Sequence, residues 1–195
     1  MDRIAAMDIV AAARGDAAAI TGPGVNSGLL YARADAPATI YNMDMGYATA
    51  IALGAALARP DRKLLAIEGD GSFFAGAAVL STIWRMRPEN LVVVVLDNEV
   101  WGTGEGTEPT ATGSGADIAG LALANGWDAA HVHTPAGSNE LSDRMGTAMV
   151  VAGPHLVVCK TDTSRDMPSS PDRPVPRRHQ LDCAVMMRAE LSGDA

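Results

Sequence analysis

The sequence predicts a doubly wound α/β domain in which a mainly parallel sheet is flanked by helices. Short apolar runs typical of strands alternate with longer helical patterns along most of the chain, as in folds built from strand–helix–strand units. One run, Leu91 to Leu96, is apolar at every position, which is the pattern of a central parallel strand covered on both faces. The chain has 195 residues, enough for one ordinary domain with a short appendage.

The first part of the chain is expected to form two helices and two short strands. Residues 2–14 place apolar side chains near one face of a helix, and the apolar run 17–21 indicates a strand. The turn Gly22-Pro23-Gly24 closes that strand. A helix over 25–33 and a short strand over 38–41 follow.

A strongly apolar segment comes next. Residues 44–58 are apolar nearly all round, which predicts a helix buried on several sides, with Asp44 as its N-cap. A strand over 63–68 then runs into Gly69-Asp70-Gly71-Ser72. That tetrapeptide stands just before a helix expected over roughly 75–86.

The second half continues the alternation and then changes composition. A glycine-rich loop at 102–115 follows the all-apolar strand. Further elements are expected near 115–125 (helix), 127–132 (strand), 137–150 (helix) and 155–161 (strand). Residues 163–178 are rich in Pro, Ser, Asp and Arg, which indicates an extended arm before a short helix near 180–191. The expected organisation is a domain over 1–164 and a C-terminal arm with a short helix over 165–195.

Composition and charge exclude several classes of function. The formal net charge is −8, whereas nucleic-acid binding needs a basic face to neutralise phosphates. The local basic cluster Arg173, Arg177 and Arg178 lies among prolines. No apolar run approaches the roughly 20 residues that span a bilayer, and no signal-peptide pattern begins the chain. Cys159 and Cys183 show no metal-type spacing, and nothing indicates a disulfide framework, so a reducing cytoplasm is expected. Together these features predict a cytoplasmic protein that binds neither nucleic acid nor a membrane.

Polar side chains end two consecutive strands of the predicted sheet. Asp70 follows the strand over 63–68, and Asn98 follows the all-apolar strand. A right-handed crossover brings both strand ends to the same edge of the sheet, where ligands of such folds bind. A carboxylate, an amide and a nearby backbone carbonyl form a hard oxygen set, which suits Mg²⁺ or Ca²⁺ better than zinc.

The residues beside Asp70 suit phosphate binding. Gly69 and Gly71 let the backbone approach a phosphate, and the Ser72 hydroxyl and the N–H groups at a helix start can donate to it. Taken alone, Gly-Asp-Gly is a common turn and indicates only a tight strand-to-helix connection. The full succession of strand, Gly-Asp-Gly-Ser, helix, apolar strand and Asp97-Asn98 is far more specific.

That succession resembles the signature of thiamine-diphosphate-dependent enzymes, which begins Gly-Asp-Gly and ends in Asn. Residues 43–54 and Asp97-Asn-Glu-Val-Trp-Gly102 are similar to the same family, and the resemblance covers roughly residues 1–165. Within the family, the sequence is similar to the sulfopyruvate decarboxylase β subunit and to the C-terminal half of phosphonopyruvate decarboxylase. The resemblance implies the thiamine-diphosphate-binding fold of the diphosphate-binding (PP) type.

The resemblance also implies roles for particular residues. Mg²⁺ would be held by the Asp70 carboxylate, the Asn98 amide and the main-chain carbonyl of Val100. Met45 would lie beneath the cofactor and force its two rings into a V, although its residue type alone favours a core methionine. The Met43 carbonyl would accept a hydrogen bond from the cofactor's 4′-amino group. The implied cofactor-binding residues are Gly22, Met43, Met45, Gly69, Gly71, Ser72, Trp101 and Gly102.

One component of the family's site has no counterpart in this sequence. The family activates its cofactor with a glutamate on a separate pyrimidine-binding domain, so no catalytic residue is assigned to this chain. We expect an α-type partner subunit that carries this domain, in a hetero-oligomer such as α2β2. The apolar helix 44–58 and the C-terminal arm are candidate contacts. His131, His133 and His155 could supply acid–base groups, but a structural role is favoured.

The activity expected from the resemblance is decarboxylation of a small 2-oxo acid by the β subunit of a two-component enzyme. Two alternatives stay open, namely a split carboligase of the acetolactate-synthase type and a non-catalytic scaffold subunit. Glu105 and Glu108 depart from the family's glycine- and threonine-rich loop. They would disfavour a dianionic substrate through like-charge repulsion, so a neutral or hydrophobic 2-oxo acid also stays open.

Overall fold

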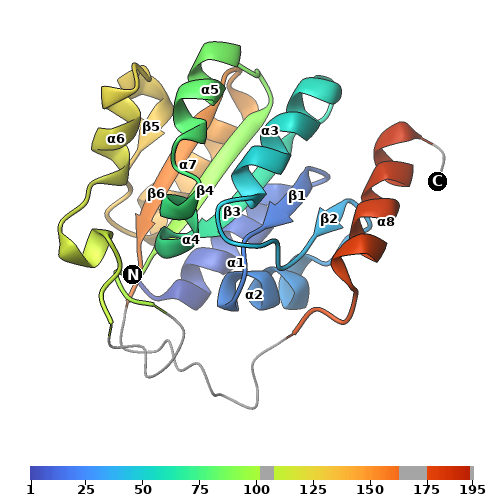
Figure 1. The fold of residues 1–195 in the computed structure, drawn as a ribbon, viewed down its shortest axis with the longest axis horizontal. Coiled ribbons are helices and arrows are strands. Elements are labelled where there is room, and N and C mark those ends of the chain that lie inside the picture. The colour runs from blue at the N-terminus through green and yellow to red at the C-terminus, as the bar shows by residue number, and fades with distance from the viewer. Residues whose placement is uncertain (102–107, 163–174, 194–195) are drawn as a thin grey trace.

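A computed structural model describes residues 1–101, 108–162 and 175–193. Over these ranges the chain folds around six strands, all parallel, in the order β2-β1-β3-β4-β6-β5 (Figure 1). This arrangement confirms the doubly wound α/β fold. The strands are β1 (Ala18–Thr21), β2 (Thr39–Ile40), β3 (Leu64–Gly69), β4 (Leu91–Asp97), β5 (Val132–His133) and β6 (His155–Lys160).

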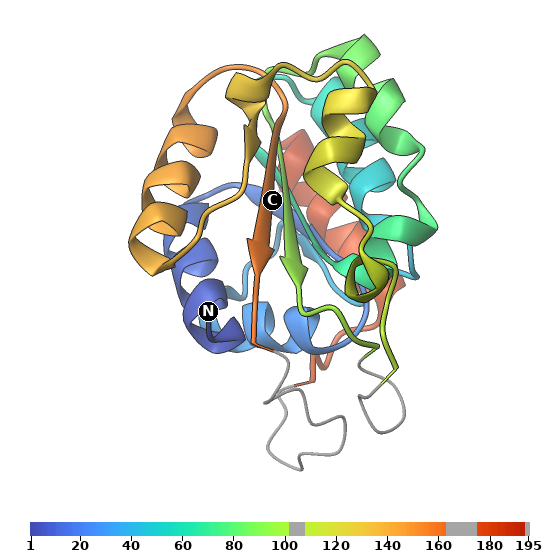
Figure 2. The same cartoon turned by 90° about the vertical axis from the view of Figure 1, so that its left-hand side faces the viewer.

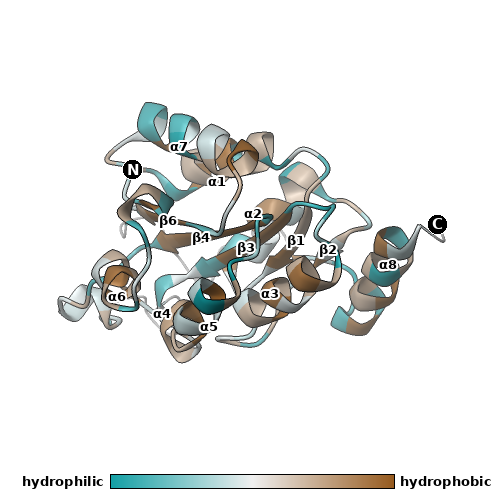
Figure 3. Cartoon of the chain, turned by 90° about the horizontal axis from the view of Figure 1, so that it is seen from above, coloured by the Kyte–Doolittle hydropathy of each residue, from teal (hydrophilic) through white to brown (hydrophobic). Residues whose placement is uncertain are grey.

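Helices cover both faces of the sheet. In Figure 3, α1, α2 and α7 lie on one side of the strands and α3 to α6 on the other, while α8 stands beside the edge strand β2. Two short 3-10 helices, η1 and η2, lie in the connections. The helices are α1 (Arg3–Arg14), α2 (Val25–Ala34), α3 (Ala48–Ala58), α4 (Asp70–Ala75), α5 (Val79–Met86), η1 (Thr112–Ser114), α6 (Ile118–Ala124), η2 (Ala129–His131), α7 (Ser138–Val150) and α8 (Gln180–Ser192).

The centre of the sheet is buried on both faces, as the all-apolar run predicts. All seven residues of β4 are buried, and β4 pairs with β3 on one side and β6 on the other. Figure 2 shows the arrowheads of β4 and β6 side by side and pointing the same way. The carboxyl ends of these strands therefore meet at one edge, where the chemistry-bearing residues are expected.

The direction of winding reverses at β1. The chain passes through α2 to β2 on one side of β1, and then through α3 to β3 on its other side. Because the two connections diverge, a crevice is left at the carboxyl ends of β1 and β3, and open α/β sheets bind ligands at such a point. The turns that follow Thr21 and Glu68 border this crevice, and both are glycine-rich.

The helix predicted over 44–58 differs from the structure at its start. Helix α3 begins at Ala48, and Asp44 is not its N-cap: the Asp44 carbonyl accepts the N–H of Tyr47 in a turn. A side chain from β3 caps the first turn of α3 instead. The Glu68 carboxylate accepts a hydrogen bond from the backbone N–H of Thr49 at 3.0 Å. A sequence pattern shows only local caps, so this tertiary one was missed.

The burial on several sides that was predicted for the helix over 44–58 was also wrong in part. One side of the helix packs on the sheet through Ala48, Ala52 and Ala56. The opposite side is exposed although it is apolar, with Tyr47 at 59% and Leu57 at 43% exposure. Within the described chain, nothing covers this apolar side.

The helix predicted over 75–86 starts later, since α5 spans Val79–Met86, and a separate helix, α4, precedes it where no helix was predicted. Helix α4 begins at Asp70, inside the glycine motif, and ends before Gly76. Between α4 and α5, Gly76 meets Gly46 backbone to backbone: a β-carbon on Gly46 would stand 2.7 Å from the Gly76 nitrogen. Two glycines far apart in the sequence thus allow the loop before α3 to pack on the end of α4.

Two further predictions were inexact. The helix expected near 115–125 is η1 followed by α6, and most of the strand expected near 127–132 is replaced by η2 and the two-residue β5. Trp127 explains the second difference, because it stacks on Trp84 and its Nε1 donates to the Leu80 carbonyl at 2.9 Å. The Asp128 side chain then accepts the N–H of Ala130, which starts a tight turn.

The C-terminal helix packs back on the domain. Helix α8 lies against β2 through Cys183 and Met187. The proposed boundary between residues 164 and 165 falls in 163–174, outside the described residues, and stays a prediction. No helix in the described ranges is long and apolar enough to cross a membrane.

Candidate functional site

A pocket of about 250 Å³ opens at the reversal point of the sheet. Its walls come from the segments after β1, β2, β3 and β4 and from the start of α1. Among the described residues, Asp70 is the one acidic side chain in these walls and Arg3 the one basic side chain. The lining residues are Arg3, Pro23, Gly24, Val25, Asn26, Met45, Gly69, Asp70, Gly71, Ser72, Asn98, Val100, Trp101 and Thr110.

The structure brings together most of the residues that the sequence indicated for this site. Those in the pocket walls are Met45, Gly69, Asp70, Gly71, Ser72, Asn98, Val100 and Trp101. Gly22 lies behind the wall, where a β-carbon would stand 2.7 Å from Glu68 Oε2 and 2.9 Å from Ser72 Oγ. Met43 is partly buried against the core. Gly102 and Glu105 lie outside the described residues.

Asp70 is held by two threonine hydroxyls. Its side chain is 2% exposed, and Oδ2 accepts hydrogen bonds from Thr110 and, at 2.8 Å, from Thr112. Neither threonine was singled out by sequence reasoning. Both lie on the segment after β4, which the fold places beside the start of α4. The carboxylate is thereby fixed in orientation inside a largely buried wall.

The Val100 carbonyl points away from the antiparallel bridge that Val100 forms with Pro109. Val100 is opposite Pro109, and the bridge is closed by the N–H of Trp101 on the Glu108 carbonyl and by the N–H of Thr110 on the Glu99 carbonyl. In a non-hydrogen-bonded antiparallel pair of this kind, the N–H and C=O of the two facing residues point away from the opposite strand. The Val100 carbonyl is therefore not hydrogen-bonded across the bridge, and Pro109 needs no N–H at this position.

The segment Gly69-Asp70-Gly71-Ser72, called the glycine turn from here on, brings its backbone close to neighbouring groups. A β-carbon on Gly71 would lie 2.5 Å from the Trp101 ring, so only glycine lets the indole pack on this turn. On the other wall, α2 begins at Val25, and Val25 and Asn26 both line the pocket. The backbone N–H groups at a helix start carry partial positive charge and favour an anion.

Glu68 is a buried carboxylate that sequence reasoning missed. It has no exposed surface, and Oε1 accepts the N–H and the hydroxyl of Thr49 at 3.0 and 3.1 Å, while Oε2 accepts the Ser72 hydroxyl. Burial raises the pKa of Glu68, and the hydrogen bonds from Ser72 and Thr49 oppose that rise. The side chain links β3, α3 and α4 directly beneath the glycine turn. The sequence signal for Glu68 was a charged residue at the end of an apolar strand, because a buried charge must be paired or hydrogen-bonded.

The histidines lie away from this pocket. His155 begins β6, at the opposite edge of the sheet, and its Nδ1 is 3.1 Å from His133 Nε2, while the His131 ring centre is 4.6 Å from that of His155. Burial and the neighbouring His131 and His133 lower the pKa of His155 to about 4. In the described ranges no three or more His, Cys, Asp or Glu side chains form a metal-type group. The expected magnesium site is of another type, with a single carboxylate.

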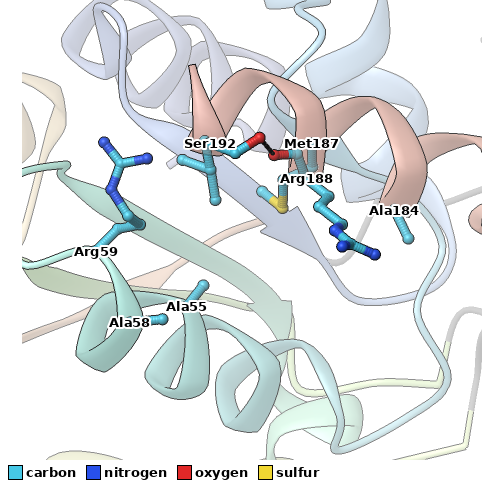
Figure 4. Close-up of a pocket in the computed structure, with 8 residues that line it drawn as sticks. Ala55, Ala58, Arg59, Ala184, Met187, Arg188 and Ser192 are labelled. Atoms are coloured by element: carbon cyan, nitrogen blue, oxygen red, sulfur yellow. Dashed lines mark hydrogen bonds between the residues drawn. The ribbon is translucent and has the colours of Figure 1, made fainter. Parts of the chain in front are cut away.

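A second pocket, between α3 and α8, lacks a comparable set of polar groups. It measures about 350 Å³, and Figure 4 shows Ala55 and Ala58 of α3 facing Ala184 and Met187 of α8. Arg59 and Arg188 stand at its rim. Its described walls carry no carboxylate, so the pocket at the strand ends is the stronger candidate for chemistry.

The oxygen-bearing residues and the glycine motif are of the kind that suits a diphosphate with a divalent metal ion. Comparison with known families identifies the family. The family described as thiamine pyrophosphate enzyme, C-terminal TPP binding domain, matches residues 28–159. The chain belongs to this family. Thiamine pyrophosphate is another name for thiamine diphosphate, so the match confirms the family that the sequence motifs indicated.

Curated members of the family include decarboxylases. Phosphonopyruvate decarboxylase of Streptomyces viridochromogenes is 36% identical over 157 residues, which is 80% of this chain and 38% of that protein. The sulfopyruvate decarboxylase β subunit of Methanocaldococcus jannaschii is 37% identical over 106 residues, which is 54% of this chain and 55% of that subunit. The chain thus spans about half or less of these relatives.

A solved structure supports the family fold. An enzyme from Mycobacterium smegmatis, described as a putative thiamin diphosphate-dependent enzyme, superposes with a TM-score of 0.71 at 21% identity. The match covers 83% of this TPP-binding chain and 32% of that enzyme. At this level of identity the match concerns the fold alone.

Proposed function

We propose that this chain is the β subunit of a two-component decarboxylase that acts on a small 2-oxo acid with thiamine diphosphate. The observation that carries the proposal is the pocket at the strand ends, which Asp70, Asn98 and Val100 line together. Hard oxygen ligands of this kind suit Mg²⁺, which usually completes its coordination with phosphate and water.

Each wall of the pocket has a proposed task. Asp70, Asn98 and the Val100 carbonyl hold Mg²⁺, while the backbone N–H groups of Gly71, Ser72 and the start of α2 bind the diphosphate. The Ser72 hydroxyl is already donated to Glu68. Met45, 41% exposed at the pocket, supports the organic part of the cofactor. When bound, the cofactor acts as an electron sink for a 2-oxo acid.

The proposal includes a partner subunit of the α type, in an assembly such as α2β2. Support comes from the relatives, which are longer than the matched region, and from the exposed apolar side of α3. That side begins at Tyr47, two residues after Met45 of the pocket, and continues to Leu57. A partner seated there would cover apolar surface that is otherwise in water and would reach the pocket's rim.

Charge in the pocket favours an anionic ligand. Arg3 supplies a positive side chain in the wall, and the charge of Asp70 would be taken up by the metal ion. Glu108 is exposed and contributes only its backbone carbonyl to the hairpin. The complete oxygen set also argues against a scaffold that has lost the site.

Calorimetry with thiamine diphosphate and Mg²⁺ tests the proposal. The chain is titrated alone and after co-expression with the adjacent reading frame, as wild type, as Asp70→Ala and as the matched control Asp143→Ala on α7. We expect metal-dependent binding to the complex that only Asp70→Ala abolishes, followed by CO₂ release from a 2-oxo acid. Unchanged binding by Asp70→Ala would show that the site is wrongly assigned.

A further inference from the structure

Asp97, just before the proposed ligands Asn98 and Val100, is a buried carboxylate with a partner on each oxygen. It is 1% exposed, at the end of β4, and its Oδ1 accepts the backbone N–H of Glu99 at 3.1 Å and the Thr112 hydroxyl at 2.8 Å. Its Oδ2 pairs with Lys160 of β6 at 2.8 Å. Every oxygen of this buried carboxylate is thus engaged.

The Glu99 hydrogen bond fixes a turn in an uncommon conformation. Glu99 has φ +65°, a left-handed conformation that a residue other than glycine keeps only where its surroundings hold it. This residue stands between Asn98 and Val100, the two proposed ligands from the β4 end. The Asp97 carboxylate therefore holds the turn that presents both of them.

Thr112 extends the hydrogen bonds of Asp97 to Asp70, the third proposed ligand. It is 5% exposed, and its hydroxyl lies 2.8 Å from Asp70 Oδ2 as well as 2.8 Å from Asp97 Oδ1. Thr110 also donates to Asp70 Oδ2 and lies 3.0 Å from the Thr112 hydroxyl. Because each hydroxyl has a single proton, Thr110 serves Asp70, and Thr112 is shared between the two carboxylates.

We infer that Thr112 is a positioning residue of the metal site. It couples the Asp70 side chain to the Asp97-held turn, so that the three ligands keep one mutual geometry before the ion arrives. Both threonines contact Asp70 through Oδ2, which leaves Oδ1 as the oxygen for the metal. This inference rests on the proposed function, because it takes Asp70, Asn98 and Val100 as the ligand set.

Magnesium makes such positioning important. The ion demands near-ideal octahedral geometry with short ligand distances, so ligands displaced by a fraction of an ångström lose much of its binding energy. Removing a group that orients a metal ligand costs about 10- to 100-fold in metal affinity. The loss of one hydroxyl at position 112 should therefore be visible without any measurement of catalysis.

Binding of Mn²⁺, a paramagnetic substitute for Mg²⁺, tests the inference by electron paramagnetic resonance. It is measured in the presence of thiamine diphosphate on the full chain, alone and co-expressed with its proposed partner. The variants are Thr112→Val, the pair Thr112→Ser and Thr112→Ala, which differ from each other only by the hydroxyl, and the control Thr147→Val. Thr147 is exposed on α7, where its hydroxyl bonds only its own helix, at the Asp143 carbonyl.

We expect Thr112→Val and Thr112→Ala to weaken Mn²⁺ binding about 10- to 100-fold, with Thr112→Ser and Thr147→Val close to wild type. The serine–alanine pair decides the question if the valine variant does not fold. Alanine binding Mn²⁺ as tightly as serine, with only the urea midpoint lowered, would show a purely structural tie and overturn the inference alone. Wild-type protein that binds no Mn²⁺ in either preparation would overturn the proposed function, and the inference with it.

Discussion

The indole ring of Trp101 packs on Gly71 so closely that a β-carbon on Gly71 would stand 2.5 Å from ring atom Cζ3. The two residues belong to the ends of different strands, since Gly71 follows β3 and Trp101 follows β4. Both line the proposed cofactor pocket. Their contact joins the glycine turn to the segment that carries Asn98 and Val100, so the shape of one depends on the other.

Substituting Gly71→Ala should displace Trp101 and deform the pocket while leaving the sheet intact. We expect thiamine diphosphate binding at least about tenfold weaker, or about 1.4 kcal/mol, measured by calorimetry on the complex. Gly146→Ala is the matched control, since a β-carbon there meets nothing within 4 Å. Equal binding by both variants would mean that Trp101 has no part in shaping the site.

Glu68 should stabilise the fold from beneath the glycine turn. Glu68→Ala leaves the buried Thr49 N–H without its acceptor and opens a cavity, so we expect a loss of roughly 2–4 kcal/mol in the free energy of unfolding. Glu68→Gln keeps an acceptor oxygen and the volume, and should lose less than alanine does. Urea unfolding of both variants, with exposed Glu89→Ala as control, measures the difference. A glutamine variant as unstable as alanine would show that the charge itself matters.

Arg3 should contribute to holding the diphosphate, because it is the one basic side chain in the described pocket walls. Replacing a charged donor to an anion typically costs about 1.5–3 kcal/mol, so Arg3→Gln should weaken cofactor binding about tenfold or more. Arg62→Gln, on the surface, serves as control. If cofactor binding is unchanged but KM for the 2-oxo acid rises, Arg3 faces the substrate instead.

His155 should make stability fall in mild acid. Its pKa in the folded chain is about 4, lowered by burial and by His131, His133 and Lys63, against an ordinary value of 6.5. Between these values the unfolded chain binds more protons, so the free energy of unfolding decreases as the pH falls from 6.5 towards 4. With partial solvent screening allowed for, we expect about 1–2 kcal/mol from this group.

Urea unfolding at several pH values, on wild type and His155→Gln, separates this effect from carboxylate titration. The variant should show a flatter decline between pH 6.5 and 4. His179→Gln is a suitable control because His179 lies on another element, at the start of α8. Identical slopes for wild type and His155→Gln would show that His155 does not titrate within the cluster.

Local patterns were enough to predict the succession of elements and the position of the site. Strands, turns and helix periods depend on residues close in the sequence, and parallel strands meet at their carboxyl ends whatever the rest of the fold does. For that reason Asp70 and Asn98 could be expected at one edge of the sheet from their places in the sequence. The family motifs added Val100 and the cofactor.

Contacts between distant segments were beyond such patterns. The first turn of α3 is capped by Glu68 from β3, where the sequence indicated Asp44. Gly76, between α4 and α5, packs against Gly46, and neither glycine shows this from its neighbours. Strand β5 is short because Trp127 packs against Trp84 of α5.

The sequence by itself determined an α/β domain and indicated a candidate hard-oxygen site at the ends of β3 and β4. Only the tertiary structure decided which groups hold that site in place, namely Glu68 beneath the glycine turn and Thr112 between Asp70 and Asp97. The physical reason is that a buried carboxylate needs donors in three dimensions. Thr49 lies 19 residues from Glu68, and Thr112 lies 42 residues from Asp70, separations that no helix or strand period spans.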